Sequence, residues 1–413
     1  MIENIDNQKE KVFVIEPIFE DKILNNEDLI FEVNSLITSA NAEPCGFIVV
    51  KIREITPSTF IGKGKLEEIK SWLDSNPVDT VVFDGVLTPS QTLNISDKLG
   101  GVKVIDRTTL ILDIFALNAK THEGKLQVEL AQLNYLYPRL KGKGQALSRL
   151  GGGIGTRGPG ETQLETDRRH IRERIDGLKK ELEELSTRRK IQAERRKKNS
   201  EITISLVGYT NSGKSTLLNL LTNSNVLAEN RLFATLDPTV RKCKIGDFEV
   251  LLVDTVGFIR NIPTEIIEAF KSTLESAVYS DVNIIVCDGS SDYLDEQLKV
   301  TNKILEEIGV KSNIITVINK CDLLDNTESF DKNSILISAK NNKGIDALIS
   351  KIQEVLNDTF VKTRLTLNYN EIGEFTKNIG FLESYSLSYT DDKVFADVTV
   401  KKVYFNKFAK FKK

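Results

Sequence analysis

Histidine is scarce in this chain, and its few cysteines are not clustered. The 413 residues include two histidines and four cysteines, and no C-x-x-C spacing occurs. These residues are His122, His170, Cys45, Cys243, Cys287 and Cys321. Isolated histidines exclude a His-based catalytic triad and a His-rich metal centre, and scattered cysteines predict neither a disulfide framework nor a zinc site. The chemistry is therefore expected to depend on bound Mg²⁺ and phosphate-binding loops.

Long apolar runs are also missing. No stretch approaches the roughly 20 residues that a bilayer span requires, and the acidic, polar start Met1–Asp6 is unlike a signal peptide. A cytoplasmic protein without a membrane span is therefore expected. A chain of 413 residues with 40% hydrophobic content is long enough for about two to four domains with substantial cores.

Charge is nearly balanced overall but unevenly distributed. The formal net charge is −3, yet basic residues crowd between Arg139 and Lys198. A local excess of positive charge on an otherwise acidic protein predicts a nucleic-acid contact in that region. The run from Arg188 to Lys198 is weaker evidence, because basic residues also favour the C-terminus of a helix.

The stretch Gly208–Thr216, GYTNSGKST, is the strongest motif in the chain. It follows the apolar run Ile202–Val207 and precedes a helix-like segment, which is the order of strand, loop and helix in a P-loop. Glycines at 208 and 213 let the backbone turn its N–H groups toward a phosphate. Lys214 is expected to contact the β- and γ-phosphates and Ser215 to ligate Mg²⁺. The alternative, a glycine turn between buried elements, is disfavoured by this order.

Apolar strands recur after the P-loop at the spacing of a doubly wound sheet. They are expected at 248–253, 282–286, 314–318 and 335–337. Ligands bind beyond the C-terminal ends of such strands, and the sequence Asp254–Gly257 follows the first of them. Asp254 is expected to hold Mg²⁺ through water, and the Gly257 N–H to sense the γ-phosphate. This loop is therefore predicted to be a switch.

Two further strand ends predict a guanine pocket. Asn319–Asp322, NKCD, follows one strand, and Ser338–Lys340 follows the next. The Asp322 carboxylate can accept hydrogen bonds from N1–H and the exocyclic amine of guanine, a pair that adenine does not present. The pocket is therefore expected to select GTP over ATP.

The other residues of these two loops have supporting roles. Lys320 is expected to lie along the base plane, and Asn319 to brace its loop against the P-loop. The Ala339 N–H is expected to face the guanine carbonyl oxygen.

The segment Phe233–Pro238 lies where a first switch belongs, and Thr235 is the candidate for a second hydroxyl on Mg²⁺. Phe258 stands where Ras-like proteins have a water-orienting glutamine. Because an aromatic ring cannot orient water by hydrogen bonding, the isolated protein is expected to hydrolyse GTP slowly. The amide oxygen of Asn211 is a candidate ligand for K⁺, which would help hydrolysis. The alternative is that Asn211 only braces the loop.

These interpretations give a defined set of site residues. The predicted catalytic residues are Lys214, Thr235, Gly257 and Asn211. The predicted Mg²⁺ ligands are Ser215, Thr235 and, through water, Asp254. The predicted GTP-binding residues are Gly208, Tyr209, Thr210, Asn211, Ser212, Gly213, Lys214, Ser215, Thr216, Phe233, Ala234, Thr235, Leu236, Asp237, Asp254, Thr255, Val256, Gly257, Asn319, Lys320, Cys321, Asp322, Ser338, Ala339 and Lys340.

The part of the chain before the P-loop predicts an α/β domain and then a helical hairpin. β-rich runs are expected at 11–15, 46–50, 80–83 and 102–105, with helix-like pieces between them. The glycine-rich Ile61–Lys65 is interpreted as a tight turn before a helix, and the alternative is a phosphate contact. Apolar residues then follow helical spacing over 126–140 and over 171–185. Two such seams predict antiparallel helices, because each seam can be buried only against a partner. Thr162–Glu165 fits a capping box of the second helix.

The loop expected at 141–160 between these helices is glycine-rich and basic. Its cations have no acidic neighbour before Glu161, and its glycines permit close approach to a surface. These cations are Lys141, Lys143, Arg149 and Arg157. A basic tip on a rigid stalk predicts RNA binding, and the alternative is a disordered linker.

These motifs together resemble the HflX family of translational GTPases over nearly the whole chain. Stretches similar to the family's signatures are Thr59–Lys65, Glu123–Leu133, Gly152–Glu165, Phe233–Pro238 and Asp254–Phe258. The resemblance implies binding to the large ribosomal subunit and its rRNA, with the hairpin loop reaching the peptidyl-transferase region. It also implies the splitting of stalled or idle ribosomes and ribosomal stimulation of GTP hydrolysis.

The expected fold class is α/β, with a central Ras-like P-loop GTPase domain. The predicted domains are an N-terminal α/β domain at 1–120, the antiparallel helical hairpin at 121–198, the GTPase domain at 199–360 and a small C-terminal α+β domain at 361–413. The leading hypothesis is a GTP hydrolase, monomeric when free, whose GTP or GDP state controls docking on the ribosome. The alternative is an RNA-binding ribosome assembly or storage factor in which GTP is only a structural ligand.

Overall fold

The computed structural model describes most of the chain and divides it into two compact units. The described residues are 9–19, 26–148, 159–198, 202–222, 232–233, 238–260, 274–324, 330 and 333–412. Unit 1 comprises 1–182, 230–234 and 261–270, and unit 2 comprises 183–229, 235–260 and 271–413. The domain boundaries expected near 120, 198 and 360 stay predictions.

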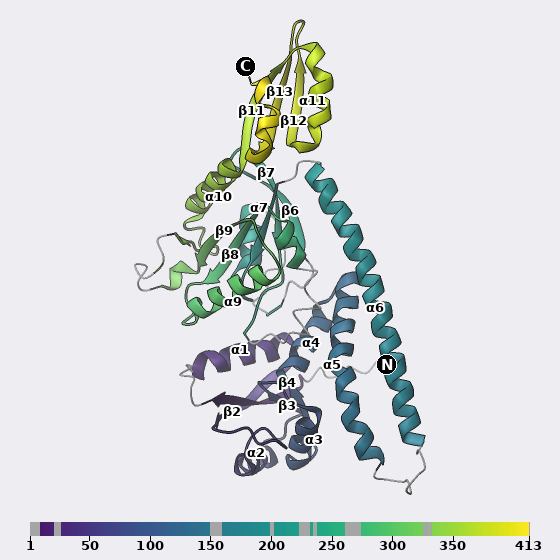
Figure 1. The fold of residues 1–413 in the computed structure, drawn as a ribbon. Coiled ribbons are helices and arrows are strands. Elements are labelled where there is room, and N and C mark those ends of the chain that lie inside the picture. Colours follow the sequence, from purple (N-terminus) through teal and green to yellow (C-terminus); the bar gives the residue numbers. More distant parts are fainter. Residues whose placement is uncertain are drawn as a thin grey trace, which may run out of the picture. The chain divides into compact units, whose positions relative to one another are not determined.

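Unit 1 contains a four-stranded parallel sheet in the order β2-β1-β3-β4, with helices on both faces (Figure 1). The strands are β1 (Lys11–Phe19), β2 (Glu43–Ile52), β3 (Thr80–Phe83) and β4 (Lys103–Asp106). The helices are α1 (Asn26–Ser39), α2 (Lys63–Ser75), α3 (Pro89–Lys98) and α4 (Arg107–Asn118). All four residues of β3 are buried, as expected for a parallel strand covered on both faces. α2 begins at Lys63, so only Ile61 and Gly62 of the turn expected at 61–65 precede the helix, and Lys63–Lys65 form its first turn.

Two long helices follow, α5 (His122–Ser148) and α6 (Pro159–Lys198). Arg174 of α6 donates two hydrogen bonds to Glu129 of α5, at 2.6 and 2.7 Å. Arg168, nearer the start of α6, lies over the ring of Tyr137, nearer the end of α5. The two helices therefore run in opposite directions where they meet (Figure 1). Between them, Leu178 is fully buried.

The predicted loop at 141–160 is longer than the structure allows. α5 continues to Ser148 and α6 begins at Pro159, so only 149–158, which lie outside the described residues, separate them. Lysine, glutamine, alanine and leucine are strong helix formers and offset the two glycines at 142 and 144, which cost about 1 kcal/mol each. The capping box at 162–165 is also wrong, because α6 begins three residues earlier at a proline, which is favoured in a first turn.

Asp106 ties α5 to the end of the parallel sheet. Its carboxylate accepts hydrogen bonds from the N–H groups of Leu87, at 3.2 Å, and Thr109, at 2.9 Å, and from the hydroxyl of Tyr135 on α5. Arg139, one turn further along α5, donates to the Leu87 carbonyl at 2.9 Å. Because Asp106 is 3% exposed, losing these partners would leave a buried charge unsatisfied.

Unit 2 contains a six-stranded sheet in the order β10-β9-β8-β5-β7-β6, parallel except for the β6–β7 pair. The strands are β5 (Ile202–Val207), β6 (Thr239–Ile245), β7 (Phe248–Asp254), β8 (Val282–Asp288), β9 (Asn313–Asn319) and β10 (Ile335–Leu336). The helices are α7 (Lys214–Thr222), α9 (Leu294–Glu307) and α10 (Ile345–Thr359). Apolar residues of α7 and α10 pack in one core with β5, β7 and β8. This is the arrangement predicted from the apolar runs, except that β6 was not located.

The C-terminal part of unit 2 is a three-stranded antiparallel sheet in the order β11-β13-β12. Its elements are β11 (Phe360–Leu367), α11 (Ile372–Asn378), β12 (Leu382–Tyr389) and β13 (Val394–Lys401). Its core contains the buried rings of Phe375, Phe408 and Phe411. None of the helices in the described part of the chain is both long and apolar enough to cross a membrane.

Candidate nucleotide site

The loop between β5 and α7 has the backbone geometry that phosphate binding requires. Gly208 and Gly213 have φ values of 142° and 95°, a region that favours glycine. A Cβ at 208 would lie 2.2 Å from the Val286 carbonyl oxygen, and one at 213 would lie 2.2 Å from Nδ2 of Asn319. Both positions therefore need glycine for space as well as for φ. Asn211, at the exposed part of the loop, has a φ of 60°, which asparagine tolerates better than most residues.

Lys214 lies inside this loop. Its Nζ donates hydrogen bonds to the carbonyl oxygens of Tyr209, at 2.7 Å, and Gly208, at 3.1 Å. Burial lowers the pKa of Lys214 to about 8, although the neighbouring Asp254 acts in the opposite direction. The ammonium group is thus held at the P-loop, and its contact with the β- and γ-phosphates stays a prediction.

Two of the predicted Mg²⁺ ligands are adjacent. The Ser215 hydroxyl donates to Oδ2 of Asp254 at 2.6 Å, and Asp254 is fully buried at the end of β7. Hydroxyl and carboxylate oxygens are the ligand types that Mg²⁺ prefers, so these residues fit the ion. The third predicted ligand, Thr235, lies outside the described residues with Ala234, Leu236 and Asp237.

The loop after β7 is bonded directly to the P-loop. The N–H of Phe258 donates to the Gly208 carbonyl at 3.0 Å, and the Thr210 N–H donates to the Phe258 carbonyl at 2.7 Å. Phe258 is 3% exposed. The hydroxyl of Thr255 donates to the Leu206 carbonyl of β5 at 2.7 Å, so it supports the loop within the fold.

The two predicted guanine loops meet at Asn319. Its Nδ2 donates to the Ser212 carbonyl at 2.8 Å, so the predicted bracing of the P-loop is confirmed. Its Oδ1 accepts from the Ala339 N–H at 2.9 Å. The Ala339 N–H was expected to donate to the guanine carbonyl oxygen. It donates to Asn319 instead, because a buried N–H requires an acceptor and the fold brings Oδ1 of Asn319 within reach. Asp322 is exposed, and a hydrogen bond from the Ser338 hydroxyl lowers the pKa of its carboxyl group.

The structure adds a residue that the sequence motifs did not indicate. Asp288, the last residue of β8, accepts a hydrogen bond from Nζ of Lys320 at 2.6 Å. The signal that could have found it is its place at the C-terminal end of a parallel strand next to β5, which is where ligands of such sheets bind.

Phe233, which belongs to unit 1, has an apolar partner that was not predicted. Its ring lies 4.6 Å from that of Phe115 on α4, and it is 3% exposed. The N–H of Leu232 donates to the Ser39 hydroxyl on α1 at 2.9 Å. Phe233 also has a φ of 59°, which is unusual for a bulky residue.

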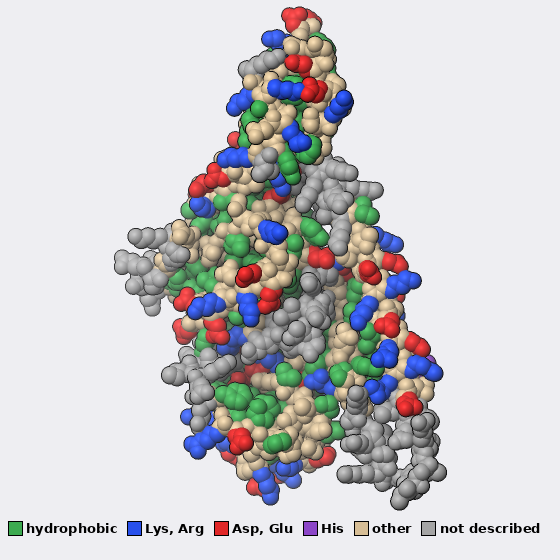
Figure 2. Space-filling model, in the orientation of Figure 1, with side chains coloured by type: hydrophobic (Ala, Val, Ile, Leu, Met, Phe, Trp, Pro, Cys, Tyr) green, Lys and Arg blue, Asp and Glu red, His purple; other side chains and the backbone are tan. Residues whose placement is uncertain are grey.

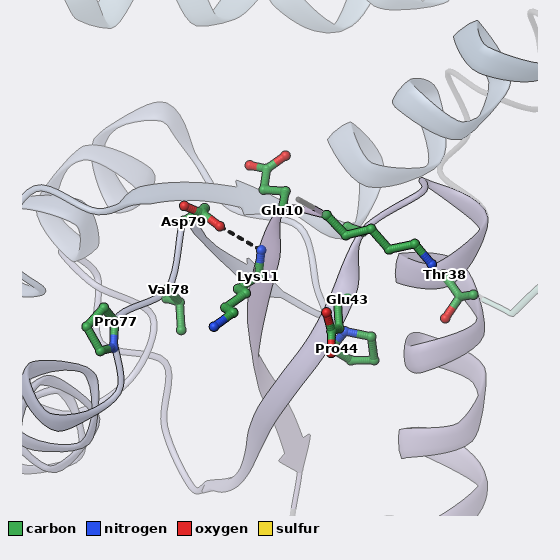
Figure 3. Close-up of a pocket in the computed structure, with 10 residues that line it drawn as sticks. Glu10, Lys11, Thr38, Glu43, Pro44, Pro77, Val78 and Asp79 are labelled. Carbon is green, nitrogen blue, oxygen red and sulfur yellow. Dashed lines mark hydrogen bonds between the residues drawn. The ribbon is translucent and has the colours of Figure 1, made fainter. Parts of the chain in front are cut away.

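A cavity of about 1230 Å³ in unit 1 is a poor candidate for a nucleotide site (Figure 3). It lies at the N-terminal ends of β1, β2 and β3, whereas ligands of parallel sheets bind at the C-terminal ends. Two of its carboxylates, those of Asp79 and Glu10, already have partners within the protein. Asp79 accepts from the Lys11 N–H at 2.7 Å, and hydrogen bonds from Thr80 and Lys103 lower the pKa of Glu10.

Comparisons with known proteins agree with this geometry. Three family models match consecutive parts of the chain. They are described as GTP-binding GTPase N-terminal (residues 27–116), GTP-binding GTPase middle region (118–196) and 50S ribosome-binding GTPase (203–320). GTPase HflX of Caldanaerobacter subterraneus subsp. tengcongensis is 47% identical over 386 residues, which cover 92% of this chain and 89% of that protein. GTPase HflX of Escherichia coli (strain K12) is 41% identical over 376 residues, which cover 89% and 87%.

The chain belongs to the HflX family of GTPases. It is therefore a GTP-hydrolysing enzyme with a P-loop GTPase domain. A crystal structure described as SsGBP in complex with GDP is similar to this HflX-family chain, with 28% identity and a TM-score of 0.50. The similarity covers 84% of this chain and 98% of that one, so it extends well beyond the GTPase domain.

The residues expected to bind RNA in this HflX-family GTPase are only partly described. Lys141 and Lys143 lie in the last turns of α5, but their side chains are outside the described residues, as are Arg149 and Arg157. Along the described part of α6, basic and acidic side chains alternate (Figure 2), and Arg169 pairs with Glu173 at 3.9 Å. The exposed side of that part of α6 therefore carries charges of both signs and faces solvent.

Proposed function

We propose that this HflX-family GTPase binds the large ribosomal subunit and its rRNA in the cytosol and dissociates stalled or idle ribosomes. The observation that carries the proposal is the match of residues 203–320, which include the P-loop, Asn319 and Lys320, to a family described as 50S ribosome-binding GTPase. The match of residues 118–196 to a middle region of GTP-binding GTPases supports a role for α5 and α6 in the same task.

In this proposal the chain's own groups hold the triphosphate and its metal ion. Lys214 and the P-loop N–H groups bind the β- and γ-phosphates. Ser215, Thr235 and, through water, Asp254 hold Mg²⁺, which supplies positive charge to the phosphate oxygens when bound. The Gly257 N–H reports the γ-phosphate to the loop that continues into Phe258.

Hydrolysis in the absence of ribosomes is expected to be slow. The buried Phe258 offers no polar group that could orient the attacking water, so the ribosome supplies the stimulation. Asn211 is an exposed residue of the phosphate loop, and we propose that its amide oxygen holds K⁺ next to the phosphates. Equal turnover in K⁺ and Na⁺ would remove that part of the proposal.

The proposed stimulation is tested by measuring GTP hydrolysis with and without purified ribosomes. Turnover should rise on addition of large subunits, and Lys214→Ala should abolish it under both conditions, because the buried ammonium is lost. Absence of stimulation would instead favour an RNA-binding assembly or storage factor.

The proposed RNA contact is tested on residues 141–160, which comprise the end of α5, the segment 149–158 and the first two residues of α6. Replacing 141–160 by a short Gly-Ser turn removes all four predicted cations, which contribute to phosphate-backbone affinity. The variant should bind GTP normally yet fail to split ribosomes in a sedimentation assay. Unchanged splitting would contradict the proposed role of this segment.

A further inference from the structure

Asp288, at the end of β8, binds the side chain of Lys320. Asp288 is not part of the predicted base loop. Nζ of Lys320 donates to Oδ2 of Asp288 at 2.6 Å. The two side chains are 27% and 21% exposed. Partial burial makes this pair less screened by salt than a pair on the open surface.

The Asp288 carboxylate is itself fixed by its own turn. Its Oδ1 accepts hydrogen bonds from the hydroxyl of Ser290, at 2.6 Å, and from the Ser290 N–H, at 3.1 Å. Because both oxygens are bonded, the carboxylate cannot rotate without losing a partner. It therefore offers Lys320 an acceptor at a defined position.

The same turn also contacts the backbone of the base loop. The Gly289 N–H donates to the Asn319 carbonyl at 2.8 Å. A Cβ at 289 would lie 2.8 Å from Cγ2 of Ile318 and 3.0 Å from that carbonyl oxygen, so the close approach requires glycine. Lys320 itself has a φ of 63°, which a lysine rarely adopts. The β8 turn thus supports the loop at the residue where its backbone is strained.

We propose that Asp288 is a positioning residue for guanine recognition. By fixing the Lys320 ammonium, it aligns the aliphatic stem of that side chain along the face of the base before a nucleotide arrives. Ordering a long flexible side chain in advance removes that entropic cost from the binding step. This inference rests on the proposed base site formed by Asn319–Asp322.

The test is a double-mutant cycle on nucleotide affinity, measured with fluorescent GDP and GTP analogues. Asp288→Asn should weaken binding of both nucleotides by about tenfold, because the contact concerns the base and not the phosphates. The loss should disappear in a Lys320→Ala background. In ribosome-free hydrolysis, Asp288→Asn should raise KM and leave kcat unchanged, an effect that an ion pair of merely structural value would not produce.

Matched variants separate this role from general damage. Asp292→Asn removes an exposed carboxylate from the same connection and should bind GDP like the wild type. Ser290→Ala keeps the charge of Asp288 and the backbone N–H bond to its Oδ1 but removes the hydroxyl bond to that oxygen, and should weaken binding by about threefold. If Asp288→Asn fails to fold, Ser290→Ala still decides, because a wild-type affinity there would overturn the proposal.

Asp322→Asn distinguishes the failure of this proposal from the failure of the base site. If Asp322→Asn binds GDP as tightly as the wild type, the base site is wrong and the role of Asp288 fails with it. If Asp322→Asn binds weakly but Asp288→Asn binds normally, the base site stands and the role of Asp288 alone is overturned. A loss in Asp288→Asn that persists in the Lys320→Ala background would also overturn it.

Discussion

Gly257, in the predicted second switch, lies close against the P-loop. An added Cβ would lie 2.7 Å from Cα of Thr210 and 2.9 Å from Nζ of Lys214. The next residue, Phe258, is bonded through its backbone to Gly208 and Thr210, so position 257 cannot withdraw without breaking those bonds. This position requires the absence of a side chain because of space.

Gly257→Ala should therefore weaken GTP binding by about tenfold to a hundredfold. Displacing Thr210 or Lys214 costs about 1–3 kcal/mol, and about 1.4 kcal/mol corresponds to tenfold in affinity. Titration calorimetry with GTP measures the change. The control is Gly177→Ala on α6, where the same methyl group meets nothing within 4 Å and GTP affinity should stay unchanged. Wild-type affinity in Gly257→Ala would contradict the packing.

At the scale of single residues, motif reasoning placed side chains correctly where their position follows from the loop itself. The spacing of the P-loop located Lys214 and Ser215. The NKCD motif predicted that Asn319 braces the P-loop, and the structure gives its partner there as Ser212. Motif reasoning failed where the partner comes from elsewhere in the fold. The pairing of Lys320 with Asp288 joins residues 32 positions apart, and no local pattern encodes that contact.

At the scale of elements, the buried strands were predictable and the exposed ones were not. β8 is almost entirely buried and reads as one apolar run. β6, at the edge of the sheet, is mostly half-exposed or exposed and carries several cations, so its apolar pattern is weak. The end of α5 was missed for a different reason, because Gly142 and Gly144 suggested a loop although the neighbouring residues favour a helix.

The α5–α6 pair should depend on apolar burial more than on its exposed ion pair. Leu178→Ala should lower the free energy of unfolding of unit 1 by about 2–5 kcal/mol, because Leu178 is fully buried. Arg174→Ala should cost much less than Leu178→Ala, because Arg174 and Glu129 are 48% and 40% exposed and water screens their attraction. Urea denaturation measures both values. A larger loss in Arg174→Ala than in Leu178→Ala would reverse this ranking.

The contact between α4 and the segment before Thr235 should restrain the first switch. Phe115→Ala removes the ring against which Phe233 packs, and such aromatic pairs contribute about 0.5–1.5 kcal/mol beyond burial. The freed segment should reach its Mg²⁺-bound position more often, so ribosome-free hydrolysis should rise several-fold. Single-turnover hydrolysis is the measurement. Leu117→Ala, an exposed position on the same helix, is the control and should have no effect. Unchanged hydrolysis in Phe115→Ala would show that this packing does not restrain the switch.

At the scale of the whole molecule, α6 is the element that both units share. It is one unbroken helix of 40 residues, about 60 Å long, and the division between the units falls between Leu182 and Glu183. Within unit 2, Arg189 of α6 lies 3.4 Å from the carboxylate of Glu275. Glu275 belongs to a helical segment, 274–279, that follows the second switch in the chain. If that segment moves, the Arg189–Glu275 pair can therefore transmit the movement to α6.

Glu275→Gln should uncouple ribosomal stimulation from basal hydrolysis. The substitution removes the charge that attracts Arg189, in a pair whose side chains are only 29% and 26% exposed and therefore partly shielded from solvent. Basal turnover should stay within about twofold, since Glu275 is not among the nucleotide-site residues. Stimulation by large subunits should fall by about tenfold, because about 1.4 kcal/mol of coupling corresponds to that factor.

Glu184→Gln, an exposed acid on α6, is the control for this variant and should keep full stimulation. Arg189→Ala should reproduce the loss, and combining it with Glu275→Gln should add nothing, since both variants break one contact. If Glu275→Gln is stimulated as strongly as the wild type, the signal from the nucleotide does not pass through this pair. Additive losses in the double variant would mean that each residue acts through a separate partner.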